Sequence, residues 1–102
     1  MVLSGENNYL DNLSSWDESI ARVQAERWDI ELTQMHLEIL YTARHFYNLY
    51  GFSPSMRPLT KFVSESLQTE KGRSIYLLTL FPGASAKLIA DIAGIPKPRN
   101  CL

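Results

Sequence analysis

The residue in this sequence best suited to covalent chemistry is Cys101, the penultimate residue of a chain of 102. A free cysteine usually lies in a core as a small hydrophobe, but this one closes the proline-rich polar tail IPKPRNCL. Lys97 and Arg99 lie within four residues of it, and nearby positive charge favours the reactive thiolate. From the residues alone, the thiol is either a functional group carried on a tail or an incidental one.

Other chemistry-bearing patterns are weak. With one cysteine available, His36 and His45 stand nine positions apart and lack the spacing of a closed zinc site. We therefore interpret both as helix-surface or hydrogen-bonded core histidines. The sequence has no glycine-rich phosphate loop and no G-x-S-x-G elbow, so no metal and no cofactor is expected. Four neighbouring aromatics are interpreted as core rather than as a base-stacking platform: Phe46, Tyr47, Tyr50 and Phe52.

Charge is distributed unevenly along the chain, although the net charge is only −1. Residues 1–38 carry eight acidic side chains against Arg22 and Arg27, whereas residues 71–102 carry five cations against Asp91. A net charge near zero argues against a general polyanion-binding protein. The asymmetry predicts either a dipolar surface that orients a partner or a solvated surface with accidental clustering.

Length and composition predict one globular domain without a membrane span. A chain of 102 residues has the common size of a single domain, and 45% hydrophobic with 21% charged residues is ordinary globular composition. No run approaches 18 apolar residues, and the start MVLSGENN lacks the features of a signal peptide. A lone cysteine cannot form an internal disulfide, so the expected compartment is the reducing cytoplasm.

Capping signals predict five helices. The first begins near Ser15, with Ser15 and Glu18 as a capping box and Trp16, Ile20 and Val23 as its apolar stripe. The second and clearest helix runs from its N-cap Thr33 to Gly51 and is expected to be the central core helix. The third has Pro58 in its first turn and extends to Leu67.

Two short helices close the predicted body. The fourth is capped by Ser74 and ends at Phe81-Pro82-Gly83, and the fifth runs from Ser85 to Gly94. Together they resemble a helix-turn-helix in outline. The fold class is therefore mostly α, a small single-domain helical bundle. Residues 1–94 form the body, residues 95–102 a flexible C-terminal arm carrying Cys101, and residues 1–13 a loose arm or short β-hairpin.

Several stretches resemble the DsrC/TusE family of small cytoplasmic sulfur carriers. The strongest are Arg44–Tyr47, Lys71–Leu77, Leu80–Pro82 and the tail Ala93–Leu102, which has the family form A-G-[LI]-P-K-P-x-x-C-x. The resemblance runs from about Tyr9 to the C-terminus. It implies a helical body with an N-terminal β-hairpin and a mobile C-terminal arm.

The resemblance also implies a function, namely a sulfurtransferase-type carrier that holds sulfur as a persulfide on Cys101. Its partners would be an upstream sulfur-donor relay complex and a downstream enzyme that makes 2-thiouridine at the tRNA wobble position. It implies neither direct nucleic-acid binding nor membrane association. Five cations are candidates to hold the arm or to stabilise the sulfur anion: Arg57, Lys61, Lys71, Lys97 and Arg99.

One departure from the family distinguishes its branches. Carriers that work with dissimilatory sulfite reductase have a second cysteine about ten residues before the penultimate one, where this chain has Ala90 and Asp91. This favours the single-cysteine, TusE-like branch. Two alternatives stay open: a partner protein of sulfite reductase or sulfur oxidation, and a nucleic-acid-binding regulator that uses the C-terminal helices and basic tail.

Overall fold

Five α-helices and two short 3-10 helices build the part of the chain that this computed structural model describes, residues 8–83 and 85–99. This part contains no strand, which confirms the mostly α prediction. In chain order the elements are η1 (Tyr9–Asn12), α1 (Glu18–Glu26), α2 (Gln34–Tyr50), α3 (Met56–Ser66), η2 (Thr69–Gly72), α4 (Ser74–Leu80) and α5 (Ala86–Ala93).

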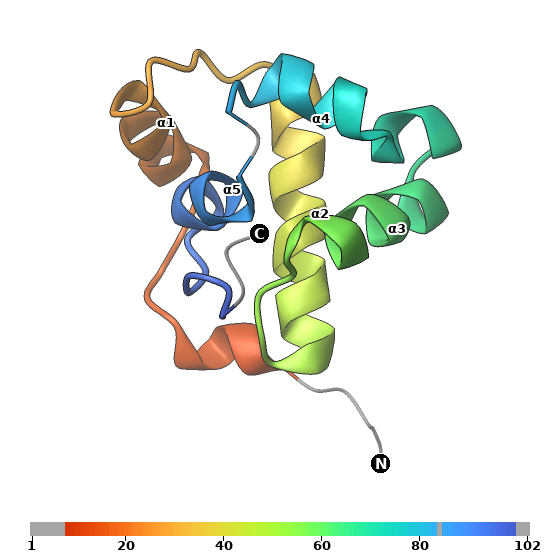
Figure 1. The fold of residues 1–102 in the computed structure, drawn as a ribbon. Coiled ribbons are helices and arrows are strands. Elements are labelled where there is room, and N and C mark those ends of the chain that lie inside the picture. Colours follow the sequence, from red (N-terminus) through yellow and green to blue (C-terminus); the bar gives the residue numbers. More distant parts are fainter. Residues whose placement is uncertain (1–7, 84, 100–102) are drawn as a thin grey trace.

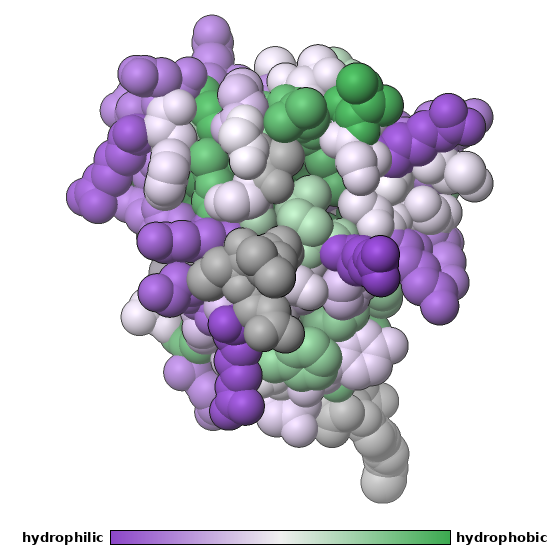
Figure 2. Space-filling model, in the orientation of Figure 1, coloured by the Kyte–Doolittle hydropathy of each residue, from purple (hydrophilic) through white to green (hydrophobic). Residues whose placement is uncertain are grey.

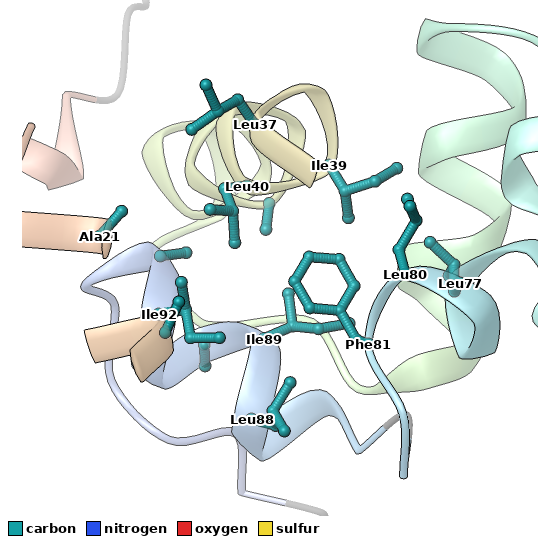
Figure 3. Packing of buried hydrophobic residues seen from close by; sticks show 14 of the residues in the cluster. Ala21, Leu37, Ile39, Leu40, Leu77, Leu80, Phe81, Leu88, Ile89 and Ile92 are labelled. Atoms are coloured by element: carbon teal, nitrogen blue, oxygen red, sulfur yellow. The ribbon is translucent and has the colours of Figure 1, made fainter. Parts of the chain in front are cut away.

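Helix α2 is the central element, as expected. It stands between α1 and α5 on one side and α3 on the other (Figure 1), and it contacts α3, α5 and η1. The core forms where Ile39 and Leu40 of α2 meet Ile89 and Ile92 of α5, with Phe81 inserted between them (Figure 3). Burial of these apolar side chains is the main force that holds the helices together.

His36 is a hydrogen-bonded core histidine, as interpreted from the sequence. Its Nδ1 lies 3.0 Å from the backbone nitrogen of Thr33, the N-cap of α2, and accepts that hydrogen bond. Its Nε2 lies 2.7 Å from the carbonyl oxygen of Leu80, to which it donates. The ring also packs edge-on against Phe81, with centroids 5.1 Å apart. One residue therefore caps α2 and ties its start to the end of α4.

The start of α1 corrects the predicted capping box. Asp17, not Ser15, is the N-cap, and its Oδ1 accepts a hydrogen bond from the Ile20 nitrogen at 3.0 Å. A carboxylate at this position also interacts favourably with the positive end of the helix dipole. The expected apolar stripe is wrong too, because Ile20 and Val23 are 41% and 57% exposed.

Small residues form the real core face of α1. Ala21 and Ala25 are fully buried, and α1 packs on α5. Short side chains let two helix backbones approach closely, so the helix buries its alanines instead of its larger β-branched residues. At α4, Arg73 is the N-cap and Ser74 the first helical residue, one position from the prediction.

The N-terminal region also differs from the expected loose arm or hairpin. Tyr9–Asn12 form the 3-10 helix η1, which packs against α2. The Leu10 nitrogen donates to Oδ1 of Asn48 at 3.1 Å, which fastens η1 to the second half of α2. The remainder of the predicted hairpin falls in residues 1–7, outside the described residues.

Candidate functional site

The arm begins at a sharp helix end. Gly94 adopts a left-handed conformation with φ of +72° and ends α5, and the Ile95 nitrogen donates to the Ala90 carbonyl at 3.0 Å. This is the hydrogen bond of a Schellman motif. A Cβ at Gly94 would lie 2.4 Å from Cδ1 of Trp16. Glycine is therefore required both by the backbone conformation and by the close approach of Trp16.

Two side chains satisfy the last carbonyl groups of α5. The Trp16 indole nitrogen donates to the Ile92 carbonyl at 2.9 Å, and Nη1 of Arg44 donates to the Ala93 carbonyl at 2.7 Å. The Arg44 guanidinium also lies 4.4 Å from the centre of the Trp16 ring. Helix C-termini leave carbonyls without intrahelical partners and favour nearby cations, so this pair stabilises the point where the arm starts.

The burial of the Arg44 guanidinium affects its pKa. Partial burial lowers the pKa of the Arg44 guanidinium from its ordinary value, and the neighbouring Tyr41 opposes that shift. Arginine stays protonated at physiological pH in spite of such a shift. Sequence reasoning missed this role of Trp16 and Arg44. The available signal was Arg44 itself, which opens one of the stretches that carry the family resemblance.

The first residues of the arm lie on the body. The Ser53 hydroxyl donates a hydrogen bond to the Pro96 carbonyl, and the side chains of Ile95 and Pro98 are buried. A cavity of about 570 Å³ opens beside them, between the arm and the C-terminal end of α2. Its lining is Tyr47, Gly51, Phe52, Ser53, Ser55, Pro96, Lys97, Pro98 and Arg99. The predicted boundary between body and arm at residue 95, and the flexibility of the arm, stay predictions.

The structure brings some of the predicted cations together. Lys97 and Arg99 both line the arm cavity. Lys61 lines a neighbouring groove of about 300 Å³ that shares Phe52 with the cavity. Arg57 is exposed in the first turn of α3, two residues after Ser55 of the cavity wall. Two cations of the arm therefore line its cavity, Lys61 lines the groove next to it, and Arg57 lies four positions before Lys61 on α3.

Lys71 is placed differently. Its Nζ lies 2.7 Å from Oε1 of Glu38 on α2, and both side chains are partly buried. This hydrogen bond raises the pKa of Lys71 above its ordinary value. Lys71 is not among the residues that line the arm cavity. Its observed contact joins η2 to α2.

Cys101, the predicted reactive residue, lies outside the described residues. Asp91 is one of the two residues, with Ala90, at the place where the resemblance implies a second cysteine in dissimilatory carriers. Asp91 accepts hydrogen bonds from Nε1 of Trp28 at 2.9 Å and from Nε2 of Gln24 at 3.2 Å. The side chain therefore fastens α5 to α1. Over residues 8–83 and 85–99, no three His, Cys, Asp or Glu side chains gather as a metal site.

The interpretation of four aromatic residues as core is only half right. Phe46 is buried and Tyr47 partly buried, but Tyr50 and Phe52 are 52% and 56% exposed. They occupy the last turn of α2 and the loop behind Gly51, where the backbone turns away from the core.

Among the described helices, none is both long and apolar enough for a transmembrane segment.

Comparisons with known proteins agree on one family. The family model described as "DsrC like protein" matches residues 2–102. A relative from Haemophilus influenzae, named sulfurtransferase TusE homolog, is 43% identical over 99% of this chain and 93% of its own length. Sulfurtransferase TusE from Escherichia coli is 42% identical over 92% of this chain and 86% of its own length.

Two solved structures share the fold. DsrC from Allochromatium vinosum superposes with a TM-score of 0.78 at 42% identity, covering 93% of this chain and 85% of that one. The oxidized gamma-subunit of the dissimilatory sulfite reductase (DsrC) from Archaeoglobus fulgidus gives 0.69 at 34% identity, covering 85% and 80%.

Proposed function

This chain belongs to the DsrC-like protein family, and from that premise we propose that it is a sulfur carrier that holds a persulfide on Cys101. The observation that carries the proposal is the tail. A penultimate cysteine follows an arm whose base is anchored on the body beside Lys97 and Arg99. The similarity to proteins named sulfurtransferase TusE supports it.

The transfer step is thiol exchange at sulfur. The Cys101 thiolate attacks the outer sulfur of a donor persulfide, R–S–SH. The donor's S–S bond breaks, a new S–S bond forms at Cys101, and the inner sulfur of the donor leaves as the thiolate R–S⁻. Electrons balance without an added oxidant or reductant. The rate depends on the thiolate fraction, the leaving group and access.

Positive charge near the arm would raise the fraction of Cys101 that is present as thiolate. A thiol with a pKa of about 8.5 is only about 3% ionised at pH 7. A pKa lower by one unit would raise that fraction to about a quarter. Because only Asn100 stands between them in the sequence, the Cα atoms of Cys101 and Arg99 are at most about 7 Å apart. We therefore assign the stabilising role first to Arg99 and Lys97, and next to Lys61 and Arg57.

We place the carrier in tRNA wobble-uridine 2-thiolation, between an upstream donor and a downstream thiolation enzyme in the cytoplasm. The TusE names of the relatives and the single cysteine support this branch. A second candidate is a partner of sulfite reductase, because one structural neighbour is the gamma-subunit of such an enzyme. A chain with a single cysteine cannot form a disulfide within its arm, which argues against a carrier that uses two arm cysteines.

Mass spectrometry tests the carrier function directly. Incubation with a persulfide donor should add about 32 Da, one sulfur atom, to the wild type, and a reductant should remove it because a persulfide is a reversible modification. Cys101→Ser should fold normally and accept no sulfur. A Cys101→Ser protein that fully restores thiolation in a deletion strain would refute the proposal.

A further inference from the structure

A groove lined by aromatic side chains lies beside the arm cavity, on the surface of α2 and α3. Phe46 forms its buried centre, with Tyr50, Phe52 and Phe62 around it at centroid distances of 4.7, 5.4 and 5.2 Å. The groove encloses about 300 Å³. Two of its aromatic side chains, Tyr50 and Phe52, are more than half exposed, although such rings are usually buried in a small monomer. Hereafter it is called the aromatic groove.

From this placement we infer that the aromatic groove is the docking site for the protein that donates sulfur to Cys101, through an apolar side chain flanked by carboxylates. The inference rests on the proposed carrier function. Three observations support it: the position of the groove, the charge around it and the orientation of its rings.

The first observation is the position of the groove relative to the arm cavity. Phe52 lines both the arm cavity and the aromatic groove, so the two lie next to each other. Three residues follow Arg99, which gives the arm a further reach of at most about 10 Å. Sulfur acceptance needs the thiolate, and Lys97 and Arg99, the arm cations that would favour it, line the cavity between the arm and the body. The donor must therefore bring its persulfide to this part of the surface, and the aromatic groove adjoins it at Phe52.

Charge indicates what kind of surface would fit. Lys61 lines the groove itself, Lys97 and Arg99 lie across Phe52, and Arg57 is exposed in the same turn of α3 as Pro58 of the groove wall. Within the described residues, none of these cations takes part in an ion pair. Glu65 is the one acidic residue in the described lining. A donor with carboxylates around its apolar anchor would complement this rim.

Ring orientation favours a protein side chain over a nucleic-acid base. Phe52 and Phe62 stand at 89° and 88° to Phe46, edge to face. The rings thus form the walls of a pocket and not a row of parallel faces on which successive bases could stack. A pocket of this kind suits one apolar anchor, which is the usual core of a protein interface.

The experiment compares two sulfur donors. Wild type, Phe52→Ser, Lys61→Glu and the control Ile75→Ser receive sulfur from glutathione persulfide or from the persulfide-loaded relay protein of the same organism. The gain of about 32 Da is followed with time. Ile75 is 69% exposed on α4 and lines neither the arm cavity nor the aromatic groove. Figure 2 shows apolar surface at the top of the view, the side on which Figure 1 draws α4.

Phe52→Ser should slow transfer from the protein donor about tenfold and leave the rate from glutathione persulfide unchanged. Lys61→Glu should slow transfer from both donors, because it also removes a cation assigned to the thiolate, and should slow transfer from the protein donor more. Ile75→Ser should match the wild type with both donors. Equal protein-donor rates in Phe52→Ser and wild type would overturn the inference. So would weaker binding of Phe52→Ser to single-stranded RNA with unchanged sulfur transfer. A wild type that accepts sulfur from neither donor would instead refute the carrier function.

Discussion

The guanidinium of Arg44 lies 4.4 Å from the centre of the Trp16 ring, and each side chain donates a hydrogen bond to a carbonyl in the last turn of α5. Trp16 precedes α1 and Arg44 belongs to α2. Three segments that are distant in sequence therefore meet at the residue before the arm. The end of α5 is held from both sides, which gives the arm a fixed origin.

Replacing Arg44 tests this arrangement. Arg44→Met removes the donor to the Ala93 carbonyl and should lower the free energy of unfolding by about 1.5–3 kcal/mol, the range for a hydrogen bond to a charged group. Arg44→Lys should recover only part of it, because an ammonium lacks the planar fork that contacts both carbonyl and ring. Urea denaturation measures both. If Arg44→Met and the wild type had equal free energies of unfolding, the hydrogen bond from Arg44 would contribute nothing to stability, and water would replace it as the partner of the Ala93 carbonyl.

Gly94→Ala should be strongly destabilising. The new Cβ would lie 2.4 Å from Cδ1 of Trp16, and alanine disfavours the φ of +72° found there. Gly83 provides a matched control, since its φ is +89° but a Cβ there meets no atom within 4 Å. The melting temperature of Gly94→Ala should fall well below that of Gly83→Ala. Similar values would mean that only backbone conformation matters at Gly94.

The cations beside the arm should control the ionisation of Cys101. Removing positive charge disfavours the thiolate, so Arg99→Ala and Arg57→Ala should raise the Cys101 pKa. Sulfur acceptance at pH 7 should slow, and its pH profile should shift upward. Lys71→Met is the control, because Lys71 pairs with Glu38. A thiol titration measures all four proteins. Equal values for wild type and Arg99→Ala would assign Arg99 to another role.

The pair of Lys71 and Glu38 should make stability depend on alkaline pH. The hydrogen bond from Lys71 raises the pKa of that lysine in the folded state. The stabilisation is therefore complete below the unfolded-state pKa, about 10.4, and is lost as pH rises through the folded-state value. Glu38→Gln should be less stable at neutral pH and should lose less on alkaline titration. Parallel stability curves for the two proteins would argue against the pair.

Local signals in the sequence predicted much of the fold. Thr33, Gly51, Ser85 and Gly94 were expected as helix ends, and each occupies that position. Capping could be predicted because a cap and its partner lie within a few residues of each other, so their hydrogen bond depends on local geometry alone. The non-helical start of the arm follows from Pro96 and Pro98 for the same reason.

The contacts of the candidate site could not be predicted from residues that are close together in the sequence. Ser15 and Asp17 are both competent caps, and the indole of Trp16 contacts α5, 76 positions away along the chain. Tyr50 and Phe52 are of a residue type that is common in cores, but they lie where α2 ends and are therefore exposed.

The sequence by itself determined both ends of α2 and of α5, the proline-stiffened arm and the single cysteine near its end. The packing of α1, α2 and α5 decided which side chains anchor that arm, and the position of η2 against α2 decided that Lys71 pairs with Glu38. Such contacts join residues from separate helices. They form only once burial of apolar surface has set the positions of those helices, because the pairing of distant groups is a product of packing and not of local propensity.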